Sequence, residues 1–307
     1  ELYKETIAAN GLNLVEGMKK LAEDIQAGHG DLKIRQVDTK PFVIGENIAA
    51  TPGKVVARSE LAEIIQYTPT TEKVLRRPLL ICPPWINKYY VLDLNPEKSF
   101  IRWALEQGHT VFVISWVNPT EKHALKNWTE YIREGFQFGL DTIEAATGER
   151  EVNAIGYCVA GTLLAGALAM FARDGEKRVA TATFLTTQVD FTFAGDLLVF
   201  VDEDQVSALE QSMYAKGYLE GTKMATAFNM LRSNELIWSY VVNNYLKGKE
   251  PSAFDLLYWN ADSTRMTAAN HSFYLRECYL ENALTEEHMI LGGAPVHLQD
   301  VKIPVIT

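Results

Sequence analysis

A cysteine with small neighbours lies between a predicted strand and a predicted helix. Residues 152–156 read VNAIG, a short apolar run typical of a buried strand, and a helical pattern starts at Val159. Cys158 has Gly156 and Ala160 two positions to either side, where the sharp turn of a nucleophile elbow excludes large side chains. This spacing predicts a nucleophilic thiol at the N-terminus of a helix, whose dipole favours the thiolate.

Two features of this motif have a second interpretation. A free cysteine is more commonly a small buried hydrophobe than a nucleophile. The Val159 amide would face a developing oxyanion, and an elbow also needs a second amide from the loop after an earlier strand. The loop 83–90 has the required place in chain order, but it would serve equally well as an ordinary loop that packs Trp85. For Cys158 the strand–turn–helix context favours the nucleophile, whereas for the loop the spacing alone does not separate the two alternatives.

The surrounding pattern predicts an α/β protein with a mostly parallel sheet of the α/β-hydrolase type and an inserted helical cap subdomain. Apolar runs typical of buried strands alternate with helical patterns, which indicates a parallel sheet covered on both faces. The predicted strands are 79–82, 111–114, 152–156 and 182–186, and the helices are 97–107, a long helix from Pro119 to about Thr147, and one from Val159. We expect an N-terminal helical segment over 1–40, the first part of the core over 41–190, the cap over 191–295, and the start of a returning core strand over 296–307.

Composition excludes several classes of protein. There are 29 Lys and Arg against 39 Asp and Glu, a net charge of −10, which argues against a nucleic-acid binder and a surface for anionic lipid. Residues 152–172 carry no charge but read as a strand followed by a helix, so no transmembrane segment is expected. Three cysteines without a CxxC motif indicate a reducing, cytosolic setting and no metal site, and the absence of a phosphate-binding glycine motif predicts no nucleotide cofactor.

Several segments resemble the polyhydroxyalkanoate synthases, and the class I type most of all. GYCVAGT at 156–162 closely resembles the lipase-like box of that family, in which cysteine is the nucleophile. Further segments similar to the family are TPGKVV at 51–56, QYTPTTEKV at 66–74, PPWINKYYVLDL at 83–94, QGHTV at 107–111, SW with NP at 115–119, and HSFYLR at 271–276.

The resemblance implies an acyltransferase that polymerises (R)-3-hydroxyacyl groups, with 3-hydroxybutyryl expected, from coenzyme A thioesters. Cys158 would hold the growing chain as a thioester, and the backbone N–H groups of Val159 and Ile86 would stabilise the oxyanion. The resemblance also implies a homodimer at polymer granules in the cytoplasm, with coenzyme A present only as part of the substrate.

The chain departs from the family pattern at three places. Ala160 stands where the box usually has glycine, and Asn270 stands where methionine is more usual. The catalytic aspartate and histidine of the family follow the strand that starts here at Val305, so we expect both beyond Thr307. The chain would then be a catalytic-core fragment without the remainder of its core.

The acidic and imidazole groups inside the chain are expected to be structural. Asp190 follows a predicted strand, where some elbow enzymes keep their acid, but a plain strand-end carboxylate is the better interpretation. None of the histidines follows a final core strand, where the base of an elbow enzyme belongs. They are His29, His109, His123, His271, His288 and His297. Two alternative functions stay open: a cysteine-dependent hydrolase or thioesterase of the same fold, and a catalytically inert fragment that binds the polymer surface.

Overall fold

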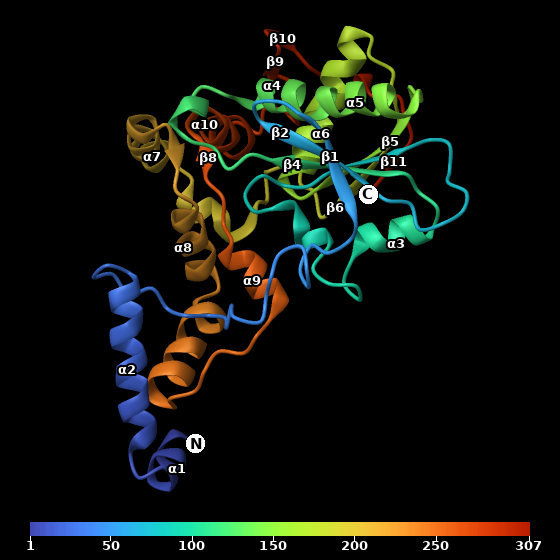
Figure 1. The fold of residues 1–307 in the computed structure, drawn as a ribbon. Helices are drawn as coiled ribbons and strands as arrows, with labels where there is room; N and C mark the ends of the chain where they lie inside the picture. Colours follow the sequence, from blue (N-terminus) through green and yellow to red (C-terminus); the bar gives the residue numbers. More distant parts are fainter. The chain divides into compact units, whose positions relative to one another are not determined.

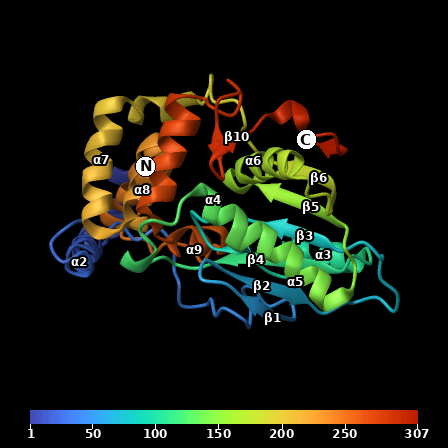
Figure 2. The ribbon, with the colours of Figure 1, turned by 90° about the horizontal axis from the view of Figure 1, so that it is seen from above.

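A seven-stranded sheet lies at the centre of the unit that residues 49–221 and 263–307 form. The computed structural model describes the backbone of residues 1–307 and all side chains except that of Phe200. The strand order is β1-β2-β4-β3-β5-β6-β11, and Figure 2 shows the strands β1 to β6 side by side in this order. The two ladders at the β1 edge are antiparallel and the other four are parallel. The strands are β1 (Gly53–Arg58), β2 (Ala62–Tyr67), β3 (Leu79–Cys82), β4 (Val111–Trp116), β5 (Val152–Tyr157), β6 (Val179–Leu185) and β11 (Val305–Ile306).

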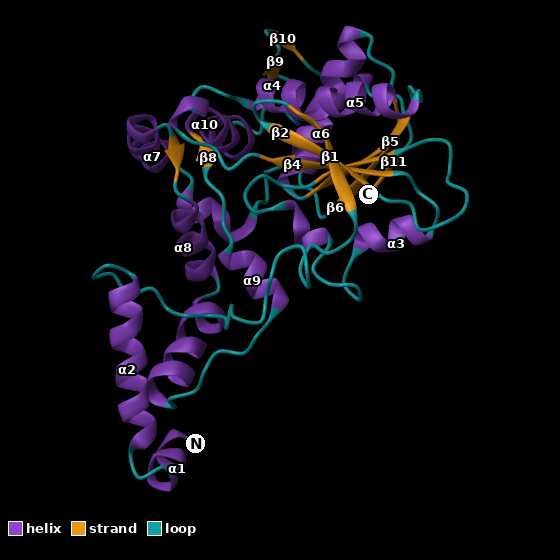
Figure 3. Cartoon of the chain, viewed as in Figure 1, coloured by secondary structure: helices purple, strands orange, loops and turns teal.

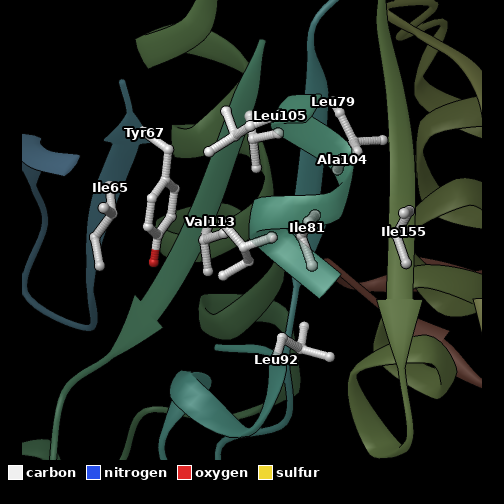
Figure 4. Packing of buried hydrophobic residues seen from close by; sticks show 11 residues of the cluster. Ile65, Tyr67, Leu79, Ile81, Leu92, Ala104, Leu105, Val113 and Ile155 are labelled. Carbon is white, nitrogen blue, oxygen red and sulfur yellow. The ribbon is translucent and has the colours of Figure 1, made fainter. Parts of the chain in front are cut away.

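Helices cover both faces of this sheet. Helix α3 (Phe100–Glu106) lies on one face, while α5 (Phe138–Thr147) and α6 (Val159–Asp174) lie on the other (Figure 1, Figure 3). Ile81, Val113 and Ile155 point to the α3 face and form a buried cluster with Leu105 (Figure 4). Because successive side chains of a strand alternate between faces, the neighbouring residues fill the opposite side, and the central strand β3 is apolar and buried throughout. The predicted α/β class and mostly parallel sheet are confirmed.

The long helix predicted from Pro119 starts later than expected. It comprises α4 (Trp128–Tyr131), a π-helical stretch η3 (Ile132–Gln137) and α5. The Asn127 side chain accepts a hydrogen bond from the Thr129 N–H, and the Glu130 carboxylate accepts one from the Asn127 N–H. This capping box satisfies amides at the helix start, so the helix begins here rather than at the proline.

The chain between β6 and β11 is mostly helical. Among the described residues, none between 186 and 304 joins the main sheet. The segment contains α7 (Glu203–Lys216), α8 (Gly221–Leu231), the π-helical η5 (Asn234–Trp238), η6 (Val241–Leu246) and η7 (Tyr274–Leu280), α9 (Asp255–Ala261) and α10 (Ala268–Phe273). Two small sheets, β7 (Tyr218–Leu219) with β8 (Met266–Thr267) and β9 (Ile290–Leu291) with β10 (Ala294–Pro295), complete it.

Contacts divide the chain into two compact units, which cut across the predicted cap of 191–295. One unit comprises Glu1–Ile48 with Thr222–Asp262, and the other comprises Ala49–Gly221 with Ser263–Thr307. In the first unit, α1 (Leu2–Ala8) precedes α2 (Leu12–Ala27), which packs on η6. A Cβ on Gly17 would lie 1.8 Å from the Tyr245 carbonyl oxygen, and the Tyr245 hydroxyl donates to Asp24 across 2.7 Å. These contacts span more than 200 residues, so the N-terminal segment 1–40 pairs with part of the predicted cap.

Candidate active site

Cys158 occupies a strained turn between β5 and α6. Its backbone has φ 57° and ψ −132°, a region that residues other than glycine rarely adopt. The Cys158 N–H donates to the Leu185 carbonyl oxygen across 2.9 Å, and the Gly161 N–H donates to the Cys158 carbonyl oxygen across 2.8 Å. The end of β6 and the first turn of α6 therefore hold this conformation from both sides, and the geometry is that of a nucleophile elbow.

Small residues make this turn possible. A Cβ on Gly156 would lie 2.6 Å from the Gly161 Cα, and a Cβ on Gly161 would lie 1.9 Å from the Thr187 Oγ1. Ala160 is fully buried. The motif predicted small residues at 156 and 160, and the structure adds Gly161, which Thr187 crowds from the turn after β6.

The Cys158 thiol differs from the other two cysteines in exposure. Cys158 is exposed, whereas Cys82 and Cys278 are buried. Partial desolvation of the sulfur by its surroundings raises the pKa of the Cys158 thiol, and a hydrogen bond from the Val159 backbone lowers it by less. No histidine or carboxylate of the described residues contributes to this pKa shift. Conversion of this thiol to a reactive thiolate thus calls for a base.

The loop that follows β3 lies beside the Cys158 turn. β3 and β5 are parallel neighbours with Cys82 opposite Gly156, so the residues after both strands meet at one edge of the sheet. The Thr264 hydroxyl contacts the carbonyl oxygens of Trp85 and Ile86 at 2.6 and 2.8 Å, which fixes the peptide groups of this loop. Val159 and Ile86, the predicted oxyanion donors, therefore share the edge that carries the thiol.

The same loop also packs an aromatic cluster. The Trp85 ring lies 6.0 Å from that of Trp116, 5.3 Å from that of Trp128 and 5.2 Å from that of Tyr131, centroid to centroid. Trp116 also donates from its indole Nε1 to the Pro83 carbonyl oxygen across 2.7 Å. The loop therefore packs Trp85 among aromatic rings, while Thr264 holds the carbonyl groups of Trp85 and Ile86.

Asp190 has a structural environment. Its carboxylate accepts hydrogen bonds from the Thr192 N–H at 2.9 Å, the Thr192 hydroxyl at 2.7 Å and the Asn282 amide at 2.9 Å. These bonds lower the pKa of Asp190, with those from Thr192 contributing most. The carboxylate thereby closes the turn after β6.

The histidines are not gathered around the thiol. His123 and His271 are buried, and the Nδ1 of His123 accepts from the Thr120 N–H across 3.0 Å. Burial lowers the pKa of His271 to about 4, so its ring is neutral near pH 7. No hydrogen bond joins the Cys158 thiol to His29, His109, His288 or His297 in the described part of the chain.

Two tyrosines that the sequence analysis did not single out, Tyr274 and Tyr279, lie in one aromatic cluster. Burial is the main cause that raises the pKa values of Tyr274 and Tyr279. The charge of a Cys158 thiolate raises both values further. The ring of Phe191 lies 6.0 Å from that of Tyr274 and 4.8 Å from that of Tyr279. Trp128 stacks on Tyr274 at 5.8 Å. The sequence signal for this pair was the two tyrosines of YLRECY, which lie five residues apart in an aromatic segment. On an α-helix, residues five apart lie on different faces, so helical periodicity does not predict that they meet.

Two kinds of feature are absent from the described residues. No group of three or more histidine, cysteine, aspartate or glutamate side chains has an arrangement that could hold a metal ion. None of the described helices combines the length and the apolar character needed to cross a bilayer.

Comparison with known proteins gives a consistent set of relatives. The family model described as "Poly-beta-hydroxybutyrate polymerase (PhaC) N-terminus" matches residues 1–104, and that described as "alpha/beta hydrolase fold" matches residues 77–290. The poly(3-hydroxyalkanoate) polymerase subunit PhaC of Rhizobium meliloti (strain 1021) is 67% identical over 99% of this chain and 50% of its own length. Poly(3-hydroxyalkanoate) polymerase of Methylorubrum extorquens is 61% identical over 99% of this chain and 50% of its own length. The PhaC subunit of Cupriavidus necator (strain H16) is 41% identical over 99% of this chain and 52% of its own length. The chain thus spans about half the length of the curated relatives it matches.

Proposed function

The chain belongs to the poly(3-hydroxyalkanoate) polymerase family and has its α/β-hydrolase fold, and on this basis we propose that it carries the nucleophile of a polyester-forming acyltransferase. The enzyme would transfer (R)-3-hydroxyacyl groups, 3-hydroxybutyryl among them, from coenzyme A to a growing chain. The observation that carries this proposal is the position of Cys158, an exposed thiol at φ 57° between a buried strand and a helix N-terminus.

In the first step a base takes the Cys158 proton and the thiolate attacks the carbonyl carbon of the substrate thioester. The backbone N–H groups of Val159 and Ile86 stabilise the oxyanion. As the new carbon–sulfur bond forms at Cys158, the bond to coenzyme A breaks, and the coenzyme A thiolate takes the proton. Because one thioester replaces another, this exchange is close to balanced in free energy.

In the second step the hydroxyl group of another unit attacks the acyl group on Cys158. An ester bond forms, the bond to the Cys158 sulfur breaks, and the hydroxyl proton returns to the thiolate through the base. The raised pKa of Cys158 supports a need for such a base. We place the base, a histidine, and its partner aspartate beyond Thr307, after the strand that β11 begins.

The proposal extends to cofactor, partners and location. Coenzyme A enters as part of the substrate, and no other cofactor or metal takes part. The enzyme acts as a homodimer on the surface of polymer granules in the cytoplasm. The net charge of −10 supports the exclusion of nucleic acid as a partner.

Intact-protein mass spectrometry of a full-length protein that contains this chain tests the proposal. After incubation with (R)-3-hydroxybutyryl-CoA we expect a ladder of hydroxybutyryl additions, which Cys158→Ala abolishes. Cys278→Ala, which alters a buried thiol, is the matched control and should keep the ladder.

Other results would contradict polymerisation. Release of free 3-hydroxybutyrate without a ladder would indicate a thioesterase. Absence of any acyl addition, together with binding to polymer granules, would indicate a surface-binding protein.

A further inference from the structure

The hydroxyl group of Thr162, in the first turn of α6, forms its hydrogen bond outside its own helix. Threonines inside helices commonly donate to the carbonyl oxygen four residues earlier, as Thr142 does to Phe138 across 2.8 Å. Thr162 is buried and donates instead to the Gln188 carbonyl oxygen across 2.7 Å, 26 residues along the chain. This bond ties the helix that follows the thiol to residues 185–188, the β6 turn.

Three polar contacts join the β6 turn to the elbow. The Leu185 carbonyl oxygen accepts the Cys158 N–H across 2.9 Å. The Thr187 hydroxyl lies 3.4 Å from the Gly156 carbonyl oxygen and 3.2 Å from that of Leu185. The third contact is the bond from Thr162, at 2.7 Å. Of the two contacts that a side chain supplies between the turn and the elbow, the one from Thr162 is the shorter, and it is the main anchor of the turn.

The β6 turn is strained at Thr186, beside the thiol. Thr186 has φ 47°, a left-handed conformation that a β-branched residue rarely adopts. Cys158 and Thr186 are the first residues after β5 and β6, and the last residues of these two strands are paired. Such strain persists only where the surrounding contacts impose it. Two strained residues therefore follow neighbouring strands, and the contacts of the β6 turn hold both.

The chain just beyond the β6 turn is held from another direction. The Thr285 hydroxyl donates to the Val189 carbonyl oxygen across 2.9 Å, and the Asn282 amide donates to the Asp190 carboxylate across 2.9 Å. These bonds do not involve α6. Without the Thr162 hydroxyl, the strained turn would keep its bonds to residues 282–285 and could relax away from the elbow.

We propose that Thr162 is a positioning residue for the reaction at Cys158, because its hydroxyl holds the β6 turn against α6 and the turn fixes the direction of the thiol. The Leu185 carbonyl oxygen fixes the Cys158 N–H and thereby the backbone from which the sulfur approaches the thioester. This inference rests on the proposed function. It assigns a part in the reaction to a buried hydroxyl that acts through the turn.

Single-turnover acylation of a full-length protein that contains this chain tests the inference. Rapid quenching and intact-mass analysis with (R)-3-hydroxybutyryl-CoA give a rate constant, which reports the geometry of the site, and an amplitude, which reports the folded fraction. Thr162→Val keeps the shape of the side chain and removes the hydroxyl. We expect the rate constant at saturating substrate to fall about tenfold to hundredfold, since a misplacement of about 1 Å has an effect of this size. The substrate concentration that gives half of this rate should stay the same.

Two further variants separate positioning from stability. Thr162→Ser keeps the hydroxyl and should restore most of the rate constant. Thr142→Val is the matched control, because it removes the hydroxyl of a buried threonine whose bond stays within its own helix. It should leave the rate constant unchanged even if the amplitude falls. Should Thr162→Val give no folded protein, Thr187→Val removes the longer contact of the same turn and should lower the rate constant by less.

Several outcomes would overturn the inference while the proposed function stands. They are an unchanged rate constant in Thr162→Val, or in Thr187→Val where that variant decides, an equal fall in Thr142→Val, and a failure of Thr162→Ser to restore the rate constant. Lack of acylation of Cys158 in the unsubstituted protein would overturn both the inference and the proposed function.

Discussion

Gly156 and Gly161 approach backbone to backbone across the turn that carries Cys158, and a Cβ on Gly156 would lie 2.6 Å from the Gly161 Cα. The contact leaves no flexible side chain that can move aside. It links the end of β5 to the first turn of α6 and thereby holds the thiol at the edge of the sheet. The two glycines are for this reason as important to the site as the cysteine between them.

We expect Gly156→Ala to lower the free energy of unfolding by about 1–3 kcal/mol, because the added methyl group forces the two backbones apart. Urea denaturation followed by circular dichroism measures the change. Gly166→Ala, in the middle of α6, is the control. A Cβ at Gly166 would meet the end of the flexible Leu291 side chain, its Cδ1, at 3.1 Å. We therefore expect the free energy of unfolding to change by no more than about 1 kcal/mol. Equal stabilities of the two variants would contradict the close contact.

Thiol labelling should distinguish Cys158 from the other cysteines. In the native protein we expect iodoacetamide to modify Cys158 alone, whereas all three cysteines react in denaturant, because Cys82 and Cys278 are buried. Since the pKa of Cys158 is raised, the labelling rate of this chain should reach half its maximum above the value of about 8.5 for a free cysteine. A rate that levels off below pH 8 would mean that a charged group in the chain already activates the thiol.

Thr264→Val tests the loop after β3. The substitution keeps the shape of the side chain but leaves the carbonyl groups of Trp85 and Ile86 without their hydroxyl partner, and we expect it to destabilise the protein by about 1–3 kcal/mol. In the full-length enzyme the acylation rate should fall about tenfold or more with little change in KM, because the Ile86 amide is displaced. Thr226→Val, which removes one exposed hydrogen bond to Thr222, controls for the substitution itself. An unchanged acylation rate would remove Ile86 from the oxyanion site.

Asn270 offers a stabilising substitution. Its side chain is fully buried, and neither its amide nitrogen nor its amide oxygen has a hydrogen-bond partner among the described residues. Asn270→Met, which restores the residue more usual in the family, should raise the free energy of unfolding by about 1 kcal/mol or more, since a flexible apolar chain needs no partner. Asn282→Met should do the opposite, because both amide atoms of Asn282 are bonded. A destabilised Asn270→Met would indicate that the asparagine has a partner.

His271 should make the protein sensitive to mild acid. Its pKa in the folded chain is about 4, below the value of about 6.5 in an unfolded chain, so the unfolded state binds the proton first. The contribution of the neutral ring is therefore complete above about pH 6.5 and is lost as the pH falls towards 4, by about 3 kcal/mol at most. Urea denaturation between pH 7 and 4.5 should show a smaller loss for His271→Phe than for the unsubstituted protein. His29→Gln, at an exposed position, should keep the original slope, and equal slopes for all three proteins would refute the assignment.

The elbow and the core strands were predictable because their signals are local. Gly156, Cys158 and Ala160 lie within five residues, and a turn this sharp allows few side chains on either side. The strands read as apolar runs because helices cover both faces of the sheet. A resemblance carried by several long segments then indicated the family, which the relatives confirm.

Two parts of the prediction differ from the structure, the first because of a local capping motif and the second because of distant contacts. The helix expected from Pro119 begins at Trp128, where Asn127 and Glu130 form a capping box. The predicted cap is divided because Gly17 and Asp24 pack against Tyr245, a contact that no local pattern contains.

The sequence by itself determined the nucleophile candidate, the sheet and the family, since each is encoded by neighbouring residues and by strand and helix periodicity. Only the tertiary structure decided which side chains meet. Tyr274 and Tyr279 would lie about 140° apart around an α-helix, and they meet because η7 is wound as a π-helix between Glu210 on one side and the turn after β6 on the other. Thr264 reaches the loop after β3 across more than 170 residues. Such contacts arise when packing brings distant segments together, and periodicity along the chain carries no information about them.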